Sequence, residues 1–133
     1  MALPGAKQND QVVGVDIHIV MVPTPGGPVP IPLPHPFAGV LDGALATSVT
    51  LGGMAAATVD STASNTPAHI PTPPGTSFQS PPTNSGTVMM GSTSVQIEGN
   101  AAARMADSVK TCNDPADMPV GQIVAAGTVL IGG

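Results

Sequence analysis

Residues 47–57 read TSVTLGGMAAA and residues 93–103 read TSVQIEGNAAA, so the same pattern recurs 46 positions further along the chain. Both copies place Thr-Ser-Val, an aliphatic residue, a glycine and three alanines in the same order. A third, truncated copy, TVLIGG, occupies residues 128–133. A fixed repeat indicates that one structural unit is used several times. Three copies in one chain predict pseudo-threefold symmetry.

A glycine-flanked apolar stretch precedes each copy: GVLDG at 39–43, GTVMMG at 86–91 and GQIVAAG at 121–127. Read as strand, tight turn and strand, each pair predicts a short β-hairpin, with glycine supplying the turn conformations. The repeats are therefore expected near 39–60, 86–108 and 121–133. The alternative is a chance alignment of Gly- and Ala-rich sequence, against which the shared Thr-Ser-Val start argues.

The composition also favours a turn-rich, all-β structure. The 133 residues are enough for one domain, and they include 16 Gly and 16 Pro but only 2 Phe, with no Trp or Tyr. Partial alternation of apolar residues predicts a strand over 12–22. The proline-rich stretches 23–36 and 65–83 exclude helix and central strand and favour extended walls. We expect a single domain over residues 1–133, with 1–11 as a flexible N-terminal segment.

The charge and hydropathy exclude several classes of protein. A formal net charge of −5 with only 3 basic residues argues against nucleic-acid binding. No apolar run reaches the length of a membrane span, and the N-terminus has no signal-peptide pattern. Only 8% of residues are charged and 41% are hydrophobic, which is unlike a disordered chain. A surface with this many apolar residues and few charges is typical of a protein that docks onto a partner.

The chain holds three histidines and one cysteine, which together make a complete tetrahedral set for Zn²⁺. Four protein ligands leave no place for water, so such a site is structural rather than catalytic. Asp16 shares a strand face with His18 and could orient its imidazole. The alternatives are solvent-facing histidines, a cysteine that only packs in the core, or Cys112 as a thiol nucleophile. The candidate ligands are His18, His35, His69 and Cys112.

No pattern for another chemistry is present. The chain lacks the G-x-S-x-G elbow of serine hydrolases and both glycine-rich phosphate-binding patterns. Its acidic residues are scattered. We therefore expect no enzymatic activity.

Residues 99–107, GNAAARMAD, resemble the signature of PAAR-repeat proteins, in which Gly and one further residue precede Pro-Ala-Ala-Arg, two residues and Asp. Ala101 stands where that family has proline, and residues 53–58 resemble a weaker first repeat. The resemblance covers about residues 12–133 and implies a small cone of short β-hairpins with pseudo-threefold symmetry, Pro-rich extended walls and a zinc-stabilised tip. It implies one structural, tetrahedral zinc ion on His18, His35, His69 and Cys112.

The resemblance also implies a function. PAAR-like proteins cap the trimeric, VgrG-like β-helical spike of contractile injection systems, such as type VI secretion systems and related phage-tail-like particles, as one monomer per trimer. The chain is then expected to be made in the bacterial cytoplasm without a signal peptide, to sharpen the spike for envelope piercing, and to help attach effector or adaptor proteins. The alternatives are an effector or effector carrier, or a metal-free Gly/Pro-rich surface protein.

Overall fold

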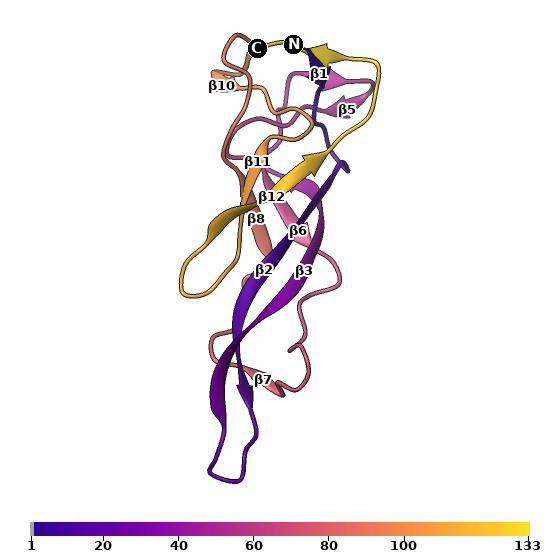
Figure 1. Cartoon of the computed structure of the whole chain (residues 1–133). Coiled ribbons are helices and arrows are strands. Elements are labelled where there is room, and N and C mark those ends of the chain that lie inside the picture. The colour runs from indigo at the N-terminus through magenta and orange to yellow at the C-terminus, as the bar shows by residue number, and fades with distance from the viewer. Residues whose placement is uncertain (1) are drawn as a thin grey trace.

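The alternating residues of Gln11–Val22 form a long strand, β2, in the computed structural model, which describes residues 2–133. β2 pairs antiparallel with β3 (Val29–Gly43) from the Gln11–Val40 pair to the Val22–Val29 pair. One face of β2 points inward, since Val12 and Val20 are fully buried. This hairpin runs down the elongated body and forms its narrow end (Figure 1).

The prolines of β3 occupy every second position from residue 30 to residue 36. The backbone groups at even-numbered positions of β3 face away from β2. The Pro34 carbonyl accepts from the Thr72 hydroxyl (2.7 Å), and the Ala38 carbonyl accepts from the Thr66 amide (3.1 Å). Proline has no N–H to donate, so a strand tolerates it at positions whose backbone nitrogen does not face a paired strand. The expectation of an extended, non-central proline-rich segment is confirmed for this part of β3. The four prolines are Pro30, Pro32, Pro34 and Pro36.

Six antiparallel strands close into a barrel that carries most of the core. Their order is β12-β11-β8-β6-β3-β2, with a further pairing of β12 to β2, and β7 adds to β2. Closure removes the exposed strand edges. The barrel encloses Phe37, Leu41, Val88, Val109 and Ile123, all buried. The added strands are β6 (Thr62–Asn65), β7 (Ser77–Phe78), β8 (Ser85–Val88), β11 (Ser108–Thr111) and β12 (Met118–Val124).

The expected all-β class is confirmed: residues 2–133 form strands, turns and loops without a helix. Accordingly, no described helix has the length and apolar character needed to cross a membrane.

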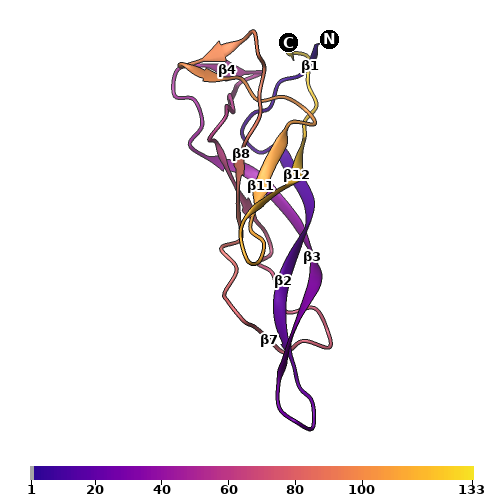
Figure 2. The ribbon, with the colours of Figure 1, turned by 60° about the vertical axis from the view of Figure 1, so that its left-hand side comes forward.

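The hairpins lie within each repeat, which differs from the predicted pairing. The glycine-flanked stretches instead belong to the barrel: 39–43 end β3, 86–88 lie in β8 and 121–124 end β12. Each repeat then leaves the barrel and forms, at the broad end, an antiparallel pair of strands of two residues each (Figures 1 and 2). Two of these pairs are hairpins, β4 (Thr50–Leu51) with β5 (Met54–Ala55) and β9 (Gln96–Ile97) with β10 (Asn100–Ala101); the third joins the two ends of the chain, β13 (Leu130–Ile131) with β1 (Leu3–Pro4).

The third repeat is completed by the N-terminus of the chain. Residues 3–10 take the place after β13 that residues 54–61 take after β4. The two segments also share a side-chain bond: Lys7 N donates to Asp10 Oδ2 (3.0 Å), and the equivalent Thr58 N donates to Ser61 Oγ (3.0 Å). The expectation of a flexible segment over 1–11 is therefore wrong for residues 3–11, which pair with β13, β12 and β3; Met1 lies outside the described residues.

A closed ring of three backbone hydrogen bonds joins the repeats. Ala6 N donates to Ala103 O (2.9 Å), Ala103 N to Ala57 O (3.0 Å) and Ala57 N to Ala6 O (3.0 Å). All three alanines have no exposed surface, so a larger side chain would meet packed neighbours. The ring uses one residue from each repeat.

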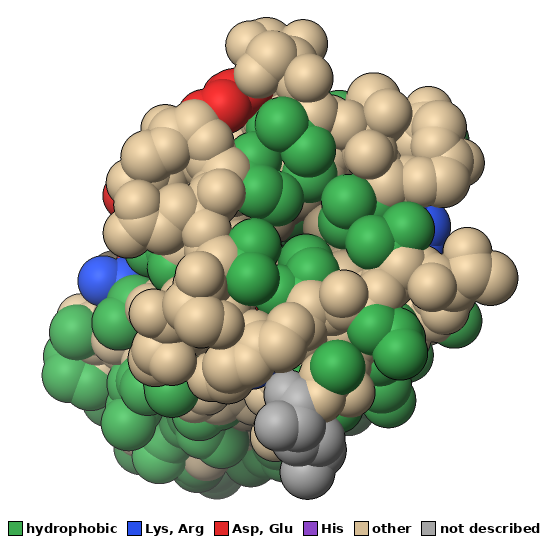
Figure 3. Space-filling view, turned by 90° about the horizontal axis from the view of Figure 1, so that it is seen from above, with side chains coloured by type: hydrophobic (Ala, Val, Ile, Leu, Met, Phe, Trp, Pro, Cys, Tyr) green, Lys and Arg blue, Asp and Glu red, His purple; other side chains and the backbone are tan. Residues whose placement is uncertain are grey.

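The broad end, called the base below, has its own small core. Equivalent residues of the three repeats, Leu51, Ile97 and Ile131, are buried there, and Val49 and Val95 pack against them. Viewed from above, apolar side chains gather at the centre of the base (Figure 3). The third repeat is the most open, with Leu130 58% exposed.

Candidate metal centre

Four potential metal ligands converge just beyond the closed part of the barrel, where β2 and β3 continue as a hairpin. Asp16 and His18, two positions apart on β2, share its inward face. Cys112 follows the last residue of β11, and His69 lies on the segment between β6 and β7. One ligand atom from each of these four residues lies within 4.8 Å of the others.

The distances fit a small metal ion. Cys112 Sγ lies 3.5 Å from Asp16 Oδ2 and 3.6 Å from His18 Nε2, while His69 Nε2 lies 2.8 Å from Asp16 Oδ2. Zinc bonds of about 2.0–2.3 Å place tetrahedral ligand atoms about 3.3–3.8 Å apart. The two sulfur distances match this spacing, and the third is a hydrogen bond that would lengthen when a metal replaces its proton.

Asp16 is the hub of this group and has no exposed surface. Its Oδ1 accepts from the Thr111 hydroxyl and from Asn113 Nδ2 (3.3 Å), and its Oδ2 faces His69 and Cys112. A buried carboxylate is tolerated only when its oxygens are bonded. Two neighbours hold Oδ1, which leaves Oδ2 free to act as a ligand.

His35 was the fourth predicted ligand, and the structure places it beside the group with both ring nitrogens bonded elsewhere. Nδ1 lies 2.9 Å from Leu33 O, and Nε2 accepts from Thr72 N (3.1 Å). Burial is the main cause that lowers the pKa of His35, so the neutral ring is favoured. His35 thus ties the 65–82 segment to β3, and its role as a ligand stays a prediction.

The sequence places Asp16 next to His18 on one strand face and predicts that Asp16 only orients the imidazole. The structure brings its carboxylate into the ligand group itself. The i, i+2 spacing on a half-buried strand was the available signal, because it directs both side chains to one face. Three predicted ligands, His18, His69 and Cys112, are brought together with it.

The second nitrogen of His18 also suits a ligand role. Nδ1 is buried without a hydrogen-bond partner and lies 3.4 Å from Asp114 Oδ2. Metal-bound histidines commonly direct the other ring nitrogen at a carboxylate. If Nε2 binds a metal, the proton on Nδ1 faces Asp114, whose Oδ2 is itself held by the Ile19 amide (2.9 Å).

The thiol of Cys112 is protonated in the absence of a metal. Burial is the main cause that raises its pKa, and the nearby Asp16 carboxylate adds to the rise. A metal ion therefore has to displace a proton from sulfur before it binds. Such an environment does not favour a free thiolate, which argues against Cys112 as an activated nucleophile.

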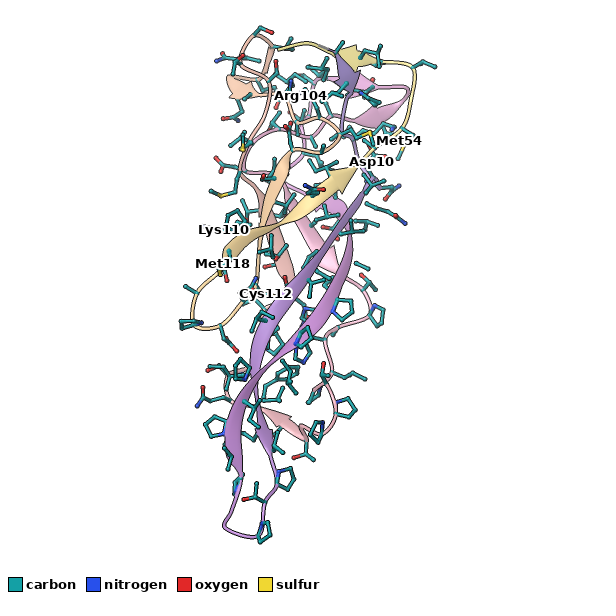
Figure 4. The ribbon with its side chains drawn as sticks, in the orientation of Figure 1. Asp10, Met54, Arg104, Lys110, Cys112 and Met118 are labelled. Carbon is teal, nitrogen blue, oxygen red and sulfur yellow. The ribbon has the colours of Figure 1, made fainter. Side chains whose placement is uncertain are left out.

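The ligand group lies above the extreme end of the body. Figure 4 shows Cys112 about midway along the length, and the β2–β3 hairpin continues below it. The hairpin extends through the Val20–Ile31 and Met21–Pro30 pairs to the 23–28 loop. The candidate centre thus joins β2, the end of β11 and the 66–76 segment at the point where the barrel narrows to two strands.

No protein-family model, no curated protein and no solved structure matches this chain.

Proposed function

We propose that this chain is a PAAR-like tip protein that caps a trimeric, VgrG-like spike of a contractile injection system. The observation that carries the proposal is the ring of Ala6, Ala57 and Ala103, through which one chain builds three equivalent units around an axis. A monomer of this kind can offer near-identical surfaces to the three subunits of a trimer.

The base has the chemistry of a docking face. Val129 is 39% and Leu130 58% exposed there, next to the buried base core. An exposed apolar patch with a polar rim is typical of a protein interface. The opposite end tapers to a two-stranded hairpin, so the base is the end suited to broad contact (Figure 2).

A zinc ion at the candidate centre would stiffen the narrow half of the molecule. The four ligands come from three separate segments; Asp16, His18 and Cys112 are buried, and the side chain of His69 is 3% exposed. Two imidazoles, a thiolate and a carboxylate are all accepted zinc ligands, and four of them leave no open position. The role that follows is mechanical: the tip transmits force and breaks no bond in a substrate.

The proposal is tested by mixing the purified chain with a trimeric spike protein and measuring the mass of the complex by native mass spectrometry. We expect one chain per trimer, and a second chain should not bind to an occupied trimer. Failure to bind, or binding of three chains per trimer, would contradict a capping role. Recovery of a toxin without any spike protein from the native host would favour the effector-carrier alternative.

The affinity for zinc should rise with pH. Because the pKa of Cys112 is raised, its proton competes with the metal throughout the neutral range. Each displaced proton makes the apparent affinity rise about tenfold per pH unit while the thiol is still protonated. Competition titrations with a chromophoric chelator at several pH values measure this slope, and the Cys112→Ser variant should lose it. A pH-independent affinity would exclude the thiolate as a ligand.

A further inference from the structure

The base has three corners, where each repeat bends sharply before its hairpin strand. The bends lie at residues 47–48 (corner 1), 93–94 (corner 2) and 127–128 (corner 3). The repeat unit places a residue from the hairpin of another repeat against each corner. Glu98 lies against corner 1, Gly132 against corner 2 and Gly52 against corner 3. These three residues hold equivalent positions in their repeats but offer different chemical groups to the corners.

Corner 1 binds a carboxylate of the chain itself. Glu98 Oε2 accepts from Thr47 N (2.9 Å), Ser48 N (2.7 Å) and Ser48 Oγ (2.5 Å). These bonds, led by the Ser48 hydroxyl, lower the pKa of Glu98 although the side chain is exposed. The corner therefore favours a carboxylate anion.

Corner 2 also holds oxygen acceptors. Ser92 Oγ donates to Gly132 O (2.5 Å) and Thr93 Oγ1 donates to Gly133 O (3.1 Å). Carbonyls of the third repeat thus occupy corner 2, while its Ser94 amide donates to Ser92 Oγ (3.1 Å) within the same repeat.

Corner 3 receives no such oxygen within residues 2–133: Gly52 lacks the carboxylate that Glu98 brings to corner 1, and no carbonyl of the Gly52 hairpin accepts from Gly127 or Thr128. A hollow of about 30 Å³ lies between Gly52 and Thr128, and Lys7 also lines it. This volume is enough for a group of about the size of a water molecule. Within residues 2–133, nothing accepts a hydrogen bond from the Thr128 hydroxyl or from the amides of residues 127–128. Lys7 Nζ, which donates to Ala126 O (2.6 Å) and is paired with Asp10 Oδ1 (3.2 Å), also lies beside this hollow.

We infer that corner 3 binds a carboxylate of the docking partner, the side chain of an aspartate or glutamate. That the carboxylate comes from the trimeric spike rests on the proposed function. A threefold-symmetric spike presents the same side chain at all three corners, but Glu98 and the carbonyls of Gly132 and Gly133 already fill two of them. Only corner 3 accepts the partner's group, which fixes the orientation of the pseudo-symmetric tip on the trimer.

The chemistry of the corner is tested without the spike, with sodium acetate as the probe. Amide NMR spectra should show the signals of Gly127 and Thr128 shifting with acetate and not with sodium chloride at equal ionic strength. Absence of these shifts overturns the inference.

Two substitutions supply matched controls. Gly52→Glu should place a carboxylate of the chain in corner 3 and abolish the acetate shifts, because Gly52 (φ 58°) has nearly the same backbone angle as Glu98 (φ 53°) and a Cβ there meets no atom within 4 Å. Gly52→Gln adds similar bulk without charge and controls for crowding. Glu98→Gly should open corner 1, so that acetate shifts the amides of Thr47 and Ser48 as well. If Glu98→Gly responds at corner 1 while corner 3 of the wild type does not, the inference is wrong.

The source of the carboxylate is tested with the spike. Gly52→Glu should weaken spike binding about tenfold or more, since it removes charge-assisted hydrogen bonds and opposes two negative charges. Acetate binding at corner 3 with unchanged spike affinity in Gly52→Glu would show that the spike does not supply the carboxylate. Failure of the wild-type chain to bind the spike would contradict the proposed function and leave the acetate result to decide the corner.

Discussion

Deletion of residues 2–10 is expected to leave the chain unfolded at room temperature. The segment supplies strand β1, one member of the alanine ring and the Lys7–Asp10 ion pair (3.2 Å). It also exchanges backbone hydrogen bonds with each of the other two repeats, including Gln8 N to Ala55 O (2.8 Å) and Met105 N to Pro4 O (2.9 Å). Each such bond contributes about 1 kcal/mol, and buried partners left unpaired cost more. The sum is comparable to the whole stability of a domain, about 5–15 kcal/mol.

Circular dichroism and amide NMR dispersion measure the outcome. A circular permutant is the matched control: a short glycine linker joins Gly133 to Leu3, and new termini open in the 23–28 loop. β1 and β13 already pair, so the joined chain should keep the native spectrum and lose little stability. A folded deletion variant would contradict the role given to the N-terminus, as would a permutant that unfolds although its segment is intact.

Removal of zinc from the loaded protein is expected to cause the second large loss of stability. A ligand present at a thousandfold excess over its dissociation constant adds about 4 kcal/mol to the free energy of unfolding. EDTA should remove this term and lower Tm sharply. His69→Ala should do the same, because it deletes a buried ligand that lies 2.8 Å from Asp16. Zinc content by elemental analysis and Tm by calorimetry check the result, and an unchanged Tm would argue against His69 as a ligand.

Two further variants separate the ligand set of the structure from the set that the resemblance implies. Asp16→Asn keeps the shape of the side chain but removes its charge, whereas His35→Asn removes the imidazole that binds Thr72. We expect the Asp16 variant to lose zinc and the His35 variant to retain it with reduced stability. The reverse pattern would show that three histidines and the cysteine hold the metal.

Much of the fold could be predicted from local patterns. Alternation predicts the strand over 12–22, the Gly and Pro content predicts the all-β class, and the two copies at 47–57 and 93–103 predict the threefold repeat. The pairing of the hairpin strands could not be predicted in this way, because a glycine-flanked apolar stretch is compatible with a hairpin strand and with a barrel strand. Only the closure of the barrel decides between them.

The place of the N-terminus in the third repeat is also not predictable from local patterns. Residues 4–10, PGAKQND, match residues 101–107, AAARMAD, at Ala6 and Asp10 and with a basic residue at position 7. This similarity is visible in the sequence. However, residues 4–10 lie at one end of the chain and the rest of their repeat, residues 128–133, lies at the other. Nothing local shows that the two ends of the chain form one unit.

The sequence by itself determined which chemistry was available: three histidines, one cysteine and a threefold pattern of small and aliphatic residues. The tertiary structure decided which of these groups meet. His18 and Cys112 are 94 positions apart and lie 3.6 Å from each other, while His35 turns its nitrogens to Leu33 and Thr72. The physical reason is that strand alternation fixes the face of each side chain, whereas the distance between faces depends on the register and closure of strands far apart in the chain.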